Sequence, residues 1–199
     1  LRWKAYVPFP YVRWQSRKES VVAKEYPKFQ EAIAELEKEF KIGKNHKNKY
    51  KVIEEEYKEG KYQPLSVVQA VEICKDIVRI FADKNIDIIR IGLQNTEEIS
   101  DPKNEGSEVV AGPYHPAFRQ LVESAMWYDA IVSKIKKLNV KAKKVEVTVN
   151  PIDINNVIGH KKENVIKLKN TYDVDLILKQ DKTIKQGKSR INITKTYDN

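Results

Sequence analysis

The sequence predicts a mixed α/β (α+β) protein in which an α/β unit is followed by a small β-α-α-β-β unit. An amphipathic helix pattern over residues 66–81 leads directly into a run of strand-forming residues, Ile86–Gln94. A second long helix pattern starts at Pro116, after a Gly-Pro turn. Beyond residue 139 short strand and helix patterns alternate. The chain of 199 residues is long enough for one large and one small unit.

The first helix and strand have clear local signals. Ser66 and Gln69 have the spacing of a capping box. Apolar side chains then recur at three-and-four spacing, at Val67, Ala70, Val71, Cys74, Ile77, Val78 and Phe81. The position of Cys74 on this stripe favours a packing role over catalysis. The run Ile86–Gln94 is rich enough in β-branched residues to predict a strand buried on both faces, as in a parallel sheet.

Four residues near the end of this strand and the start of the next helix are candidate active-site-edge residues. Gly92 permits close backbone approach and Gln94 offers an amide, at the strand end where barrels carry their chemistry. A turn glycine and a surface glutamine explain the same pattern equally well. His115 could cap the helix, bind a phosphate or transfer a proton, and a positioning role is favoured because no acidic or nucleophilic partner is evident nearby. Arg119 is placed to reach an anion or a carboxylate.

The tail has the patterns of the small unit. Strands are predicted over Lys144–Val149, Asp175–Leu178 and Ser189–Thr194, and helices over Asp153–Ile158 and Glu163–Thr171. Residues 134–199 hold 16 Lys and Arg against 7 Asp and Glu, whereas residues 52–133 hold 8 against 15. A basic tail behind an acidic middle indicates separate units, with the tail facing a polyanion. A lysine-rich solvated surface is the alternative.

Residues 1–51 have no clear assignment. They begin with an aromatic and basic segment, Leu1–Trp14, which could stack on bases but more often packs on a neighbouring surface. A helix pattern follows from Pro27 to Phe40. A divergent insertion, a frame-shifted stretch and a chimeric junction all remain open. The chain has one cysteine, no apolar run of membrane-spanning length and no signal-peptide pattern, which predicts a cytoplasmic protein without membrane contact.

Two motifs resemble radical S-adenosylmethionine (radical SAM) proteins related to the catalytic subunit of Elongator. They are the RIGLQ strand, Arg90–Gln94, and the GPYHPAFR helix start, Gly112–Arg119, with a similar link in YKEGKYQPL, Tyr57–Leu65. The resemblance covers residues 52–131 and, less closely, 140–195. It implies that residues 52–138 supply closing elements of an incomplete (β/α) barrel and a helical linker, and that the complete protein modifies a tRNA wobble uridine.

The resemblance also implies cofactors that this chain cannot hold alone. Radical SAM enzymes bind a 4Fe-4S cluster through a Cys-x-x-x-Cys-x-x-Cys loop, with S-adenosylmethionine on the remaining iron. The chain has Cys74 alone, so no metal ligand or catalytic residue is assigned to it, and whether it belongs to an enzyme depends on its parent. The implied partner is an N-terminal radical SAM core that carries the cysteines.

Residues 139–199 look like a degenerate KH nucleic-acid-binding module. Their β-α-α-β-β order places Gly159 between the two helices, where that module has a Gly-x-x-Gly loop against the sugar-phosphate backbone. The fourth position is Lys162 instead of glycine, and the module's last helix is missing. The candidate RNA-binding residues are therefore Gly159, His160, Lys161 and Lys162, of which the last three supply cations. The expected partner is tRNA or another RNA, with no DNA. The rivals are a stand-alone RNA-binding adaptor and a truncated or chimeric product.

Overall fold

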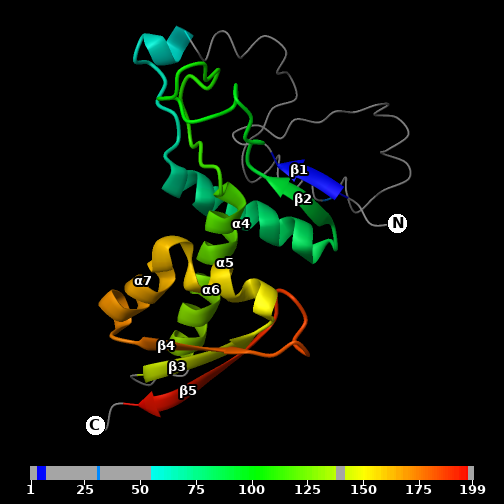
Figure 1. The fold of residues 1–199 in the computed structure, drawn as a ribbon, viewed down its shortest axis with the longest axis vertical. Helices are drawn as coiled ribbons and strands as arrows, with labels where there is room; N and C mark the ends of the chain where they lie inside the picture. The colour runs from blue at the N-terminus through cyan, green and yellow to red at the C-terminus, as the bar shows by residue number, and fades with distance from the viewer. Residues whose placement is uncertain (1–3, 8–30, 32–54, 138–141, 197–199) are drawn as a thin grey trace. The chain divides into compact units, whose positions relative to one another are not determined.

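The computed structural model describes residues 4–7, 31, 55–137 and 142–196, and it divides into two compact units, Leu1–Arg119 and Gln120–Asn199. The division falls in the first turn of α5, Phe118–Lys137 (Figure 1). The predicted arm and helix of residues 1–51 lie outside the described residues, except for Lys4–Val7 and Glu31. No helix in the described ranges is long and apolar enough to cross a membrane.

The first unit is built on α4, Val67–Asp83, which packs against β2, Asp87–Ile91. The predicted capping box is confirmed, because Ser66 Oγ accepts a hydrogen bond from the Gln69 amide at 3.3 Å and Gln69 Oε1 accepts one from the Ser66 amide at 2.9 Å. The predicted apolar stripe is buried at Ala70, Val71, Cys74, Ile77 and Phe81. Local pattern therefore determined this helix and the face that it buries.

The strand β2 pairs in parallel with β1, Lys4–Val7, but it is shorter and less buried than predicted. The prediction was a strand over Ile86–Gln94 buried on both faces, whereas the side chain of Ile89 is 40% exposed. Two physical reasons account for the difference. The left-handed backbone of Gly92, with φ of +85°, follows the end of the strand. Within the described residues, moreover, burial alternates along β2, which leaves Asp87 and Ile89 on its more exposed face.

The second unit carries a three-stranded mixed sheet in the order β4-β3-β5 (Figure 1). Its strands are β3, Ala142–Val149, β4, Asp175–Gln180, and β5, Ser189–Thr196. The central β3 runs parallel to β4 and antiparallel to β5. Between β3 and β4 the chain forms η1, Pro151–Asp153, α6, Ile154–Ile158, η2, His160–Lys162, and α7, Glu163–Tyr172. The α+β class is confirmed, and these elements follow in the predicted order.

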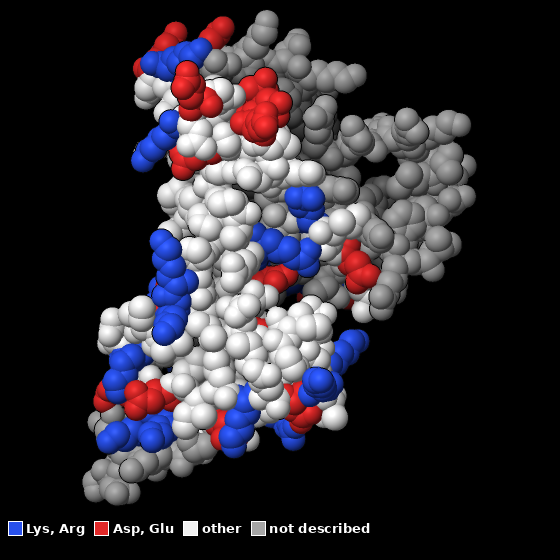
Figure 2. Space-filling view, in the orientation of Figure 1, with Lys and Arg blue, Asp and Glu red and all other residues white. Residues whose placement is uncertain are grey.

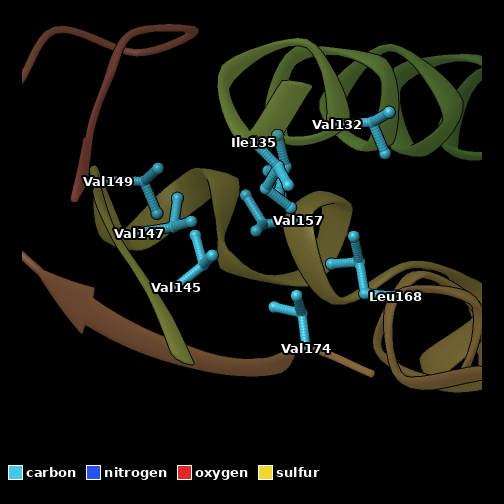
Figure 3. Packing of buried hydrophobic residues seen from close by; sticks show 9 residues of the cluster. Val132, Ile135, Val145, Val147, Val149, Val157, Leu168 and Val174 are labelled. Atoms are coloured by element: carbon cyan, nitrogen blue, oxygen red, sulfur yellow. The ribbon is translucent and has the colours of Figure 1, made fainter. Parts of the chain in front are cut away.

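One hydrophobic cluster joins the sheet of the second unit to its helices (Figure 3). The alternating side chains of Val145, Val147 and Val149 are fully buried on one face of β3. They pack with residues of α5, α6, α7 and the start of β4, namely Ile131, Val132, Ile135, Val157, Leu168 and Val174. The second unit therefore has a core of its own, in which α5 supplies one wall.

Candidate nucleic-acid interface

The loop between α6 and α7, Gly159–Lys162, has an unusual backbone. Gly159 has φ of 84° and ψ of 162°, a conformation that is essentially restricted to glycine. Lys161 and Lys162 follow with φ of 50° and 64°, in the left-handed region that costs a non-glycine residue about 1–2 kcal/mol. The loop is closed by a hydrogen bond from the Lys162 amide to the Gly159 carbonyl at 3.1 Å. The four predicted RNA-binding residues thus lie together in one strained turn.

A buried asparagine imposes this conformation. Asn164, in the first turn of α7, is 3% exposed. Its Nδ2 donates to the Ser124 carbonyl of α5 at 2.8 Å and to the Val157 carbonyl of α6 at 3.1 Å. A Cβ on Gly159 would lie 2.9 Å from the backbone nitrogen of Asn164 and 3.0 Å from its Cγ. The absence of a side chain at Gly159 lets α6 and α7 approach this closely, and the buried Asn164 amide donates to one carbonyl of α5 and one of α6.

A second hydrogen bond joins α6, close to the α6–α7 loop, to α5. The Nδ2 of Asn156 in α6 donates to Glu123 Oε2 in α5 at 2.7 Å. Sequence analysis did not identify Asn164, Asn156 or Glu123 as site residues. The one usable signal was that Asn164 lies four residues before the buried Leu168, and so on the inward face of α7.

The loop presents cations at the start of a helix. Lys161 and Lys162 are exposed, and His160 is half-buried. The next residue, Glu163, forms an ion pair with Lys167 at 2.5 Å, one turn further along α7. The positively charged lysines are repelled by the positive end of the helix dipole at the N-terminus of α7. An anion bound at this point would be attracted both by the lysines and by the dipole. The arrangement is therefore suited to a phosphate group.

The connection between β4 and β5 is a second basic segment of this unit. Lys182, Lys185 and Lys188 are exposed there, and none of the described carboxylates forms an ion pair with them. The segment is held in place by Asp153 Oδ2, which accepts from the Gly187 amide at 2.8 Å, and by Asn150 Nδ2, which donates to the Ile184 carbonyl at 2.9 Å. Figure 2 shows Lys and Arg side chains over this unit with Asp and Glu among them. The positive charge of the tail is thus spread over more than one loop.

The candidate residues of the first unit lie around β2 and the start of α5. Gly92 is buried, and a Cβ there would lie 3.0 Å from the Cβ of Phe118. Close packing of Phe118 on the strand end therefore requires glycine at this position. Gln94, by contrast, is exposed. The role of these residues at the edge of an active site stays a prediction.

His115 and Arg119 both make local contacts with the backbone. His115 Nδ1 accepts a hydrogen bond from the Ala117 amide at 3.1 Å, which caps the turn that leads into α5. The Arg119 guanidinium donates to the carbonyls of Ile89 at 2.9 Å and Ile88 at 3.2 Å, and so ties α5 to β2. The functional roles of His115 and Arg119 stay predictions.

The residues of this chain do not fit an iron–sulfur cluster. Three thiolates are needed, and the single cysteine, Cys74, is buried in α4. Burial without a compensating charge raises the pKa of the Cys74 thiol from 9.0 to about 12, so the thiol stays protonated at neutral pH. In the part of the chain that the structure describes, no three His, Cys, Asp or Glu side chains group as metal ligands.

The Cys74 thiol is expected to resist alkylation in the folded protein. Because the folded-state pKa is raised to about 12, the thiol contributes no pH dependence to stability below its ordinary value of 9.0, and stability falls as the pH rises above that value. Labelling with a thiol reagent at pH 8 should be slow in buffer and fast in urea. Rapid labelling of the folded protein would contradict the buried position.

Comparison with known proteins identifies one part of the chain. Residues 49–128 match the family model described as the Radical_SAM C-terminal domain. No curated protein and no solved structure matches the chain. The matched segment contains α4, β2 and the first half of α5, together with the four candidate residues of the first unit. Residues 49–128 are therefore similar to the C-terminal domain of radical SAM proteins, and this supports a radical SAM C-terminal extension in this part of the chain.

Proposed function

We propose that this chain is the C-terminal, RNA-positioning part of an Elongator-like radical SAM protein that modifies a tRNA wobble uridine in the cytoplasm. The family match over residues 49–128 supports the radical SAM assignment. The observation that carries the RNA contact is the α6–α7 loop, where two exposed lysines follow Gly159, which packs closely against the buried Asn164. The chain binds and positions RNA and is not catalytic by itself.

The strain in the loop supports a role for its lysines. Glycine would adopt the left-handed backbone of Lys161 and Lys162 at a lower conformational cost. Strained backbone that persists in a well-packed corner is typical of functional sites. Two exposed ammonium groups at a helix start can neutralise neighbouring phosphates of a single strand, as a KH-like module would.

The catalytic group belongs, in this proposal, to a radical SAM core that carries the three cysteines. Such a core would supply the 4Fe-4S cluster and S-adenosylmethionine, for which this chain has no ligand set. The partly exposed Ile89 of β2 leaves apolar surface that further barrel elements would cover. Gly92, His115 and Arg119 would then lie at the edge of the completed active site.

Changing Lys161 and Lys162 together to alanine is expected to weaken tRNA binding and its salt dependence. Each lysine–phosphate contact contributes about 0.7–0.9 to the slope of log K against log salt concentration. The double variant should therefore lose about one to two units of slope. The measurement is tRNA binding to the full chain by fluorescence anisotropy between about 50 and 200 mM salt.

The matched control is the double change of Lys134 and Lys136 to alanine. Both lysines are exposed on α5, so the variant loses the same formal charge without changing the α6–α7 loop. The slope of log K against log salt concentration for this control variant should stay closer to that of the unsubstituted chain. Equal slopes for the two double variants would show that the loop makes no special phosphate contact.

A stand-alone RNA-binding adaptor is the second candidate function. This candidate is favoured because the second unit has its own hydrophobic cluster, formed by residues of α5, β3, α6 and α7 and by Val174 just before β4. The two candidates differ in one observable. RNA held by the parent enzyme is modified when the radical SAM core and S-adenosylmethionine are supplied, and RNA held by an adaptor is not.

A further inference from the structure

The sheet of the second unit ends in a strand that has an open edge. Among the described strands, β5 pairs with β3 alone and is the last strand in the order β4-β3-β5 (Figure 1). The pairing of β5 with β3 is irregular only near Ala142–Val145, and it is regular along Ser189–Ile193. The outer edge of such a strand carries backbone N–H and C=O groups that are ready to pair with another strand.

The regular part of β5 lacks the features that usually block pairing at a sheet edge. Ser189–Ile193 contains no lysine, proline or bulge, and the charge of Arg190 is paired with Asp181. The other edge strand, β4, differs because it carries the charged side chains of Asp175 and Lys179 and packs against α7. Of the two edges, β5 is therefore the one suited to pairing.

The side chains along this edge alternate between apolar and polar. Ile191 and Ile193 lie opposite Val147 and Val145 of β3, are half-buried and pack against the hydrophobic cluster of the unit. A further strand beside β5 would cover the part of these two side chains that stays exposed. Asn192 lies between them on the opposite face of the sheet and is exposed.

We propose that β5 pairs antiparallel with β5 of a second copy of this chain, about a twofold axis at Asn192. The two three-stranded sheets would then form one sheet of six strands. In this register Ile191 lies opposite Ile193 of the other copy, and each Asn192 lies opposite its own counterpart. The asparagine amide is both a donor and an acceptor, so two copies of it can hydrogen-bond to each other. Arg190 falls opposite Thr194, so no like charges face each other.

The symmetry of the side-chain pattern is the reason for choosing a second copy as the occupant. A strand of another protein could supply the same backbone hydrogen bonds. The triplet Ile191-Asn192-Ile193, however, reads the same in both directions, and two identical antiparallel strands therefore match in this register. A shift by one residue would place isoleucine opposite asparagine. The inference uses no residue of the α6–α7 loop and does not rest on the proposed RNA contact.

The test is sedimentation equilibrium of the RNA-free full chain. One strand pair is a small interface, so a reversible dimer with a dissociation constant on the order of 10–100 µM is expected. Asn192→Lys should weaken dimerisation about tenfold, because two ammonium groups would face each other across the axis. In the monomer the new lysine lies opposite Glu146 of β3, which favours the folded unit. The control Gln180→Lys adds the same charge at an exposed position of β4 and should leave dimerisation nearly unchanged.

A mixing experiment tests the register itself. Asn192→Lys and Asn192→Asp should each dimerise poorly alone, whereas an equal mixture should form a heterodimer in which lysine faces aspartate. No recovery in the mixture would overturn the proposed register.

Three further outcomes would overturn the inference. The first is a chain that stays monomeric throughout the micromolar range. The second is equal weakening by Asn192→Lys and Gln180→Lys, which would report general repulsion between basic chains. The third is a dimer that added salt dissociates, because the chain has a net charge of +9 and salt should reduce the repulsion between copies. None of these results bears on the tRNA salt slope, so the proposed function is tested separately.

Discussion

Replacing Gly159 with alanine is expected to lower the free energy of unfolding of the second unit by about 3 kcal/mol. Two effects add. The backbone at φ of 84° and ψ of 162° is strained for any residue with a Cβ, and the new methyl group would lie 2.9 Å from the backbone nitrogen of Asn164. Because backbone cannot move aside as a flexible side chain can, α6 and α7 must separate. Amide hydrogen exchange in β3 under native conditions reports the opening of this unit.

The matched control is Gly187→Ala, in the connection between β4 and β5. Gly187 also has a positive φ, of 75°, but nothing lies within 4 Å of the position that its Cβ would take. Only the conformational cost should appear, about 1 kcal/mol. Equal losses at the two glycines would contradict the close approach at Gly159.

Changing Asn164 to aspartate is expected to cost about 3 kcal/mol of unfolding free energy at neutral pH. The amide donor that bonds the Ser124 and Val157 carbonyls is replaced by an oxygen, so those two carbonyls lose their donor and face a buried negative charge. The change keeps the size of the side chain, and a large loss therefore reports hydrogen bonding rather than volume. Hydrogen exchange in β3, as for Gly159, provides the measurement.

The new carboxyl group of Asn164→Asp gives this prediction a pH signature. Burial raises the pKa of an aspartate above its ordinary value near 3.9, so the cost is small below about pH 4 and grows as the pH rises above it. Asn170→Asp, at an exposed position of the same helix, should show no such loss with rising pH. A pH-independent cost at Asn164 would argue against a buried, charged carboxylate.

The changes at Gly159 and Asn164 both alter the packing between α6 and α7 at their shared loop. They therefore test whether the stability of the second unit and its proposed RNA binding depend on the same contacts. Asn164 bonds a carbonyl of α6 and a carbonyl of α5 from the first turn of α7, directly after the two left-handed lysines. The backbone conformation of these lysines is therefore expected to depend on the buried Asn164. The proposed RNA contact thus depends on the packing of α5, α6 and α7 in the second unit.

Elements with strong local patterns followed from the sequence. The helix after Ser66 has its capping box and its buried stripe where periodicity placed them, because capping and amphipathicity depend on residues three or four apart. The α6–α7 loop was located for the same reason, since Gly159 separates two short helical patterns. The length and burial of β2 were predicted less well, because a strand's burial depends on the elements that cover it.

The sequence by itself determined the helices that begin after Ser66, before Phe118 and on either side of Gly159, together with the basic loop, the single cysteine and the resemblance to radical SAM proteins. Tertiary structure decided what holds that loop. The partners of Asn164 lie 40 positions away in α5 and 7 positions away in α6, so no local pattern could pair them. The exposure of Ile166 likewise depends on which face of α7 the core covers. Hydrogen bonds and burial are set by contacts between distant segments, and these exist only once the chain has folded.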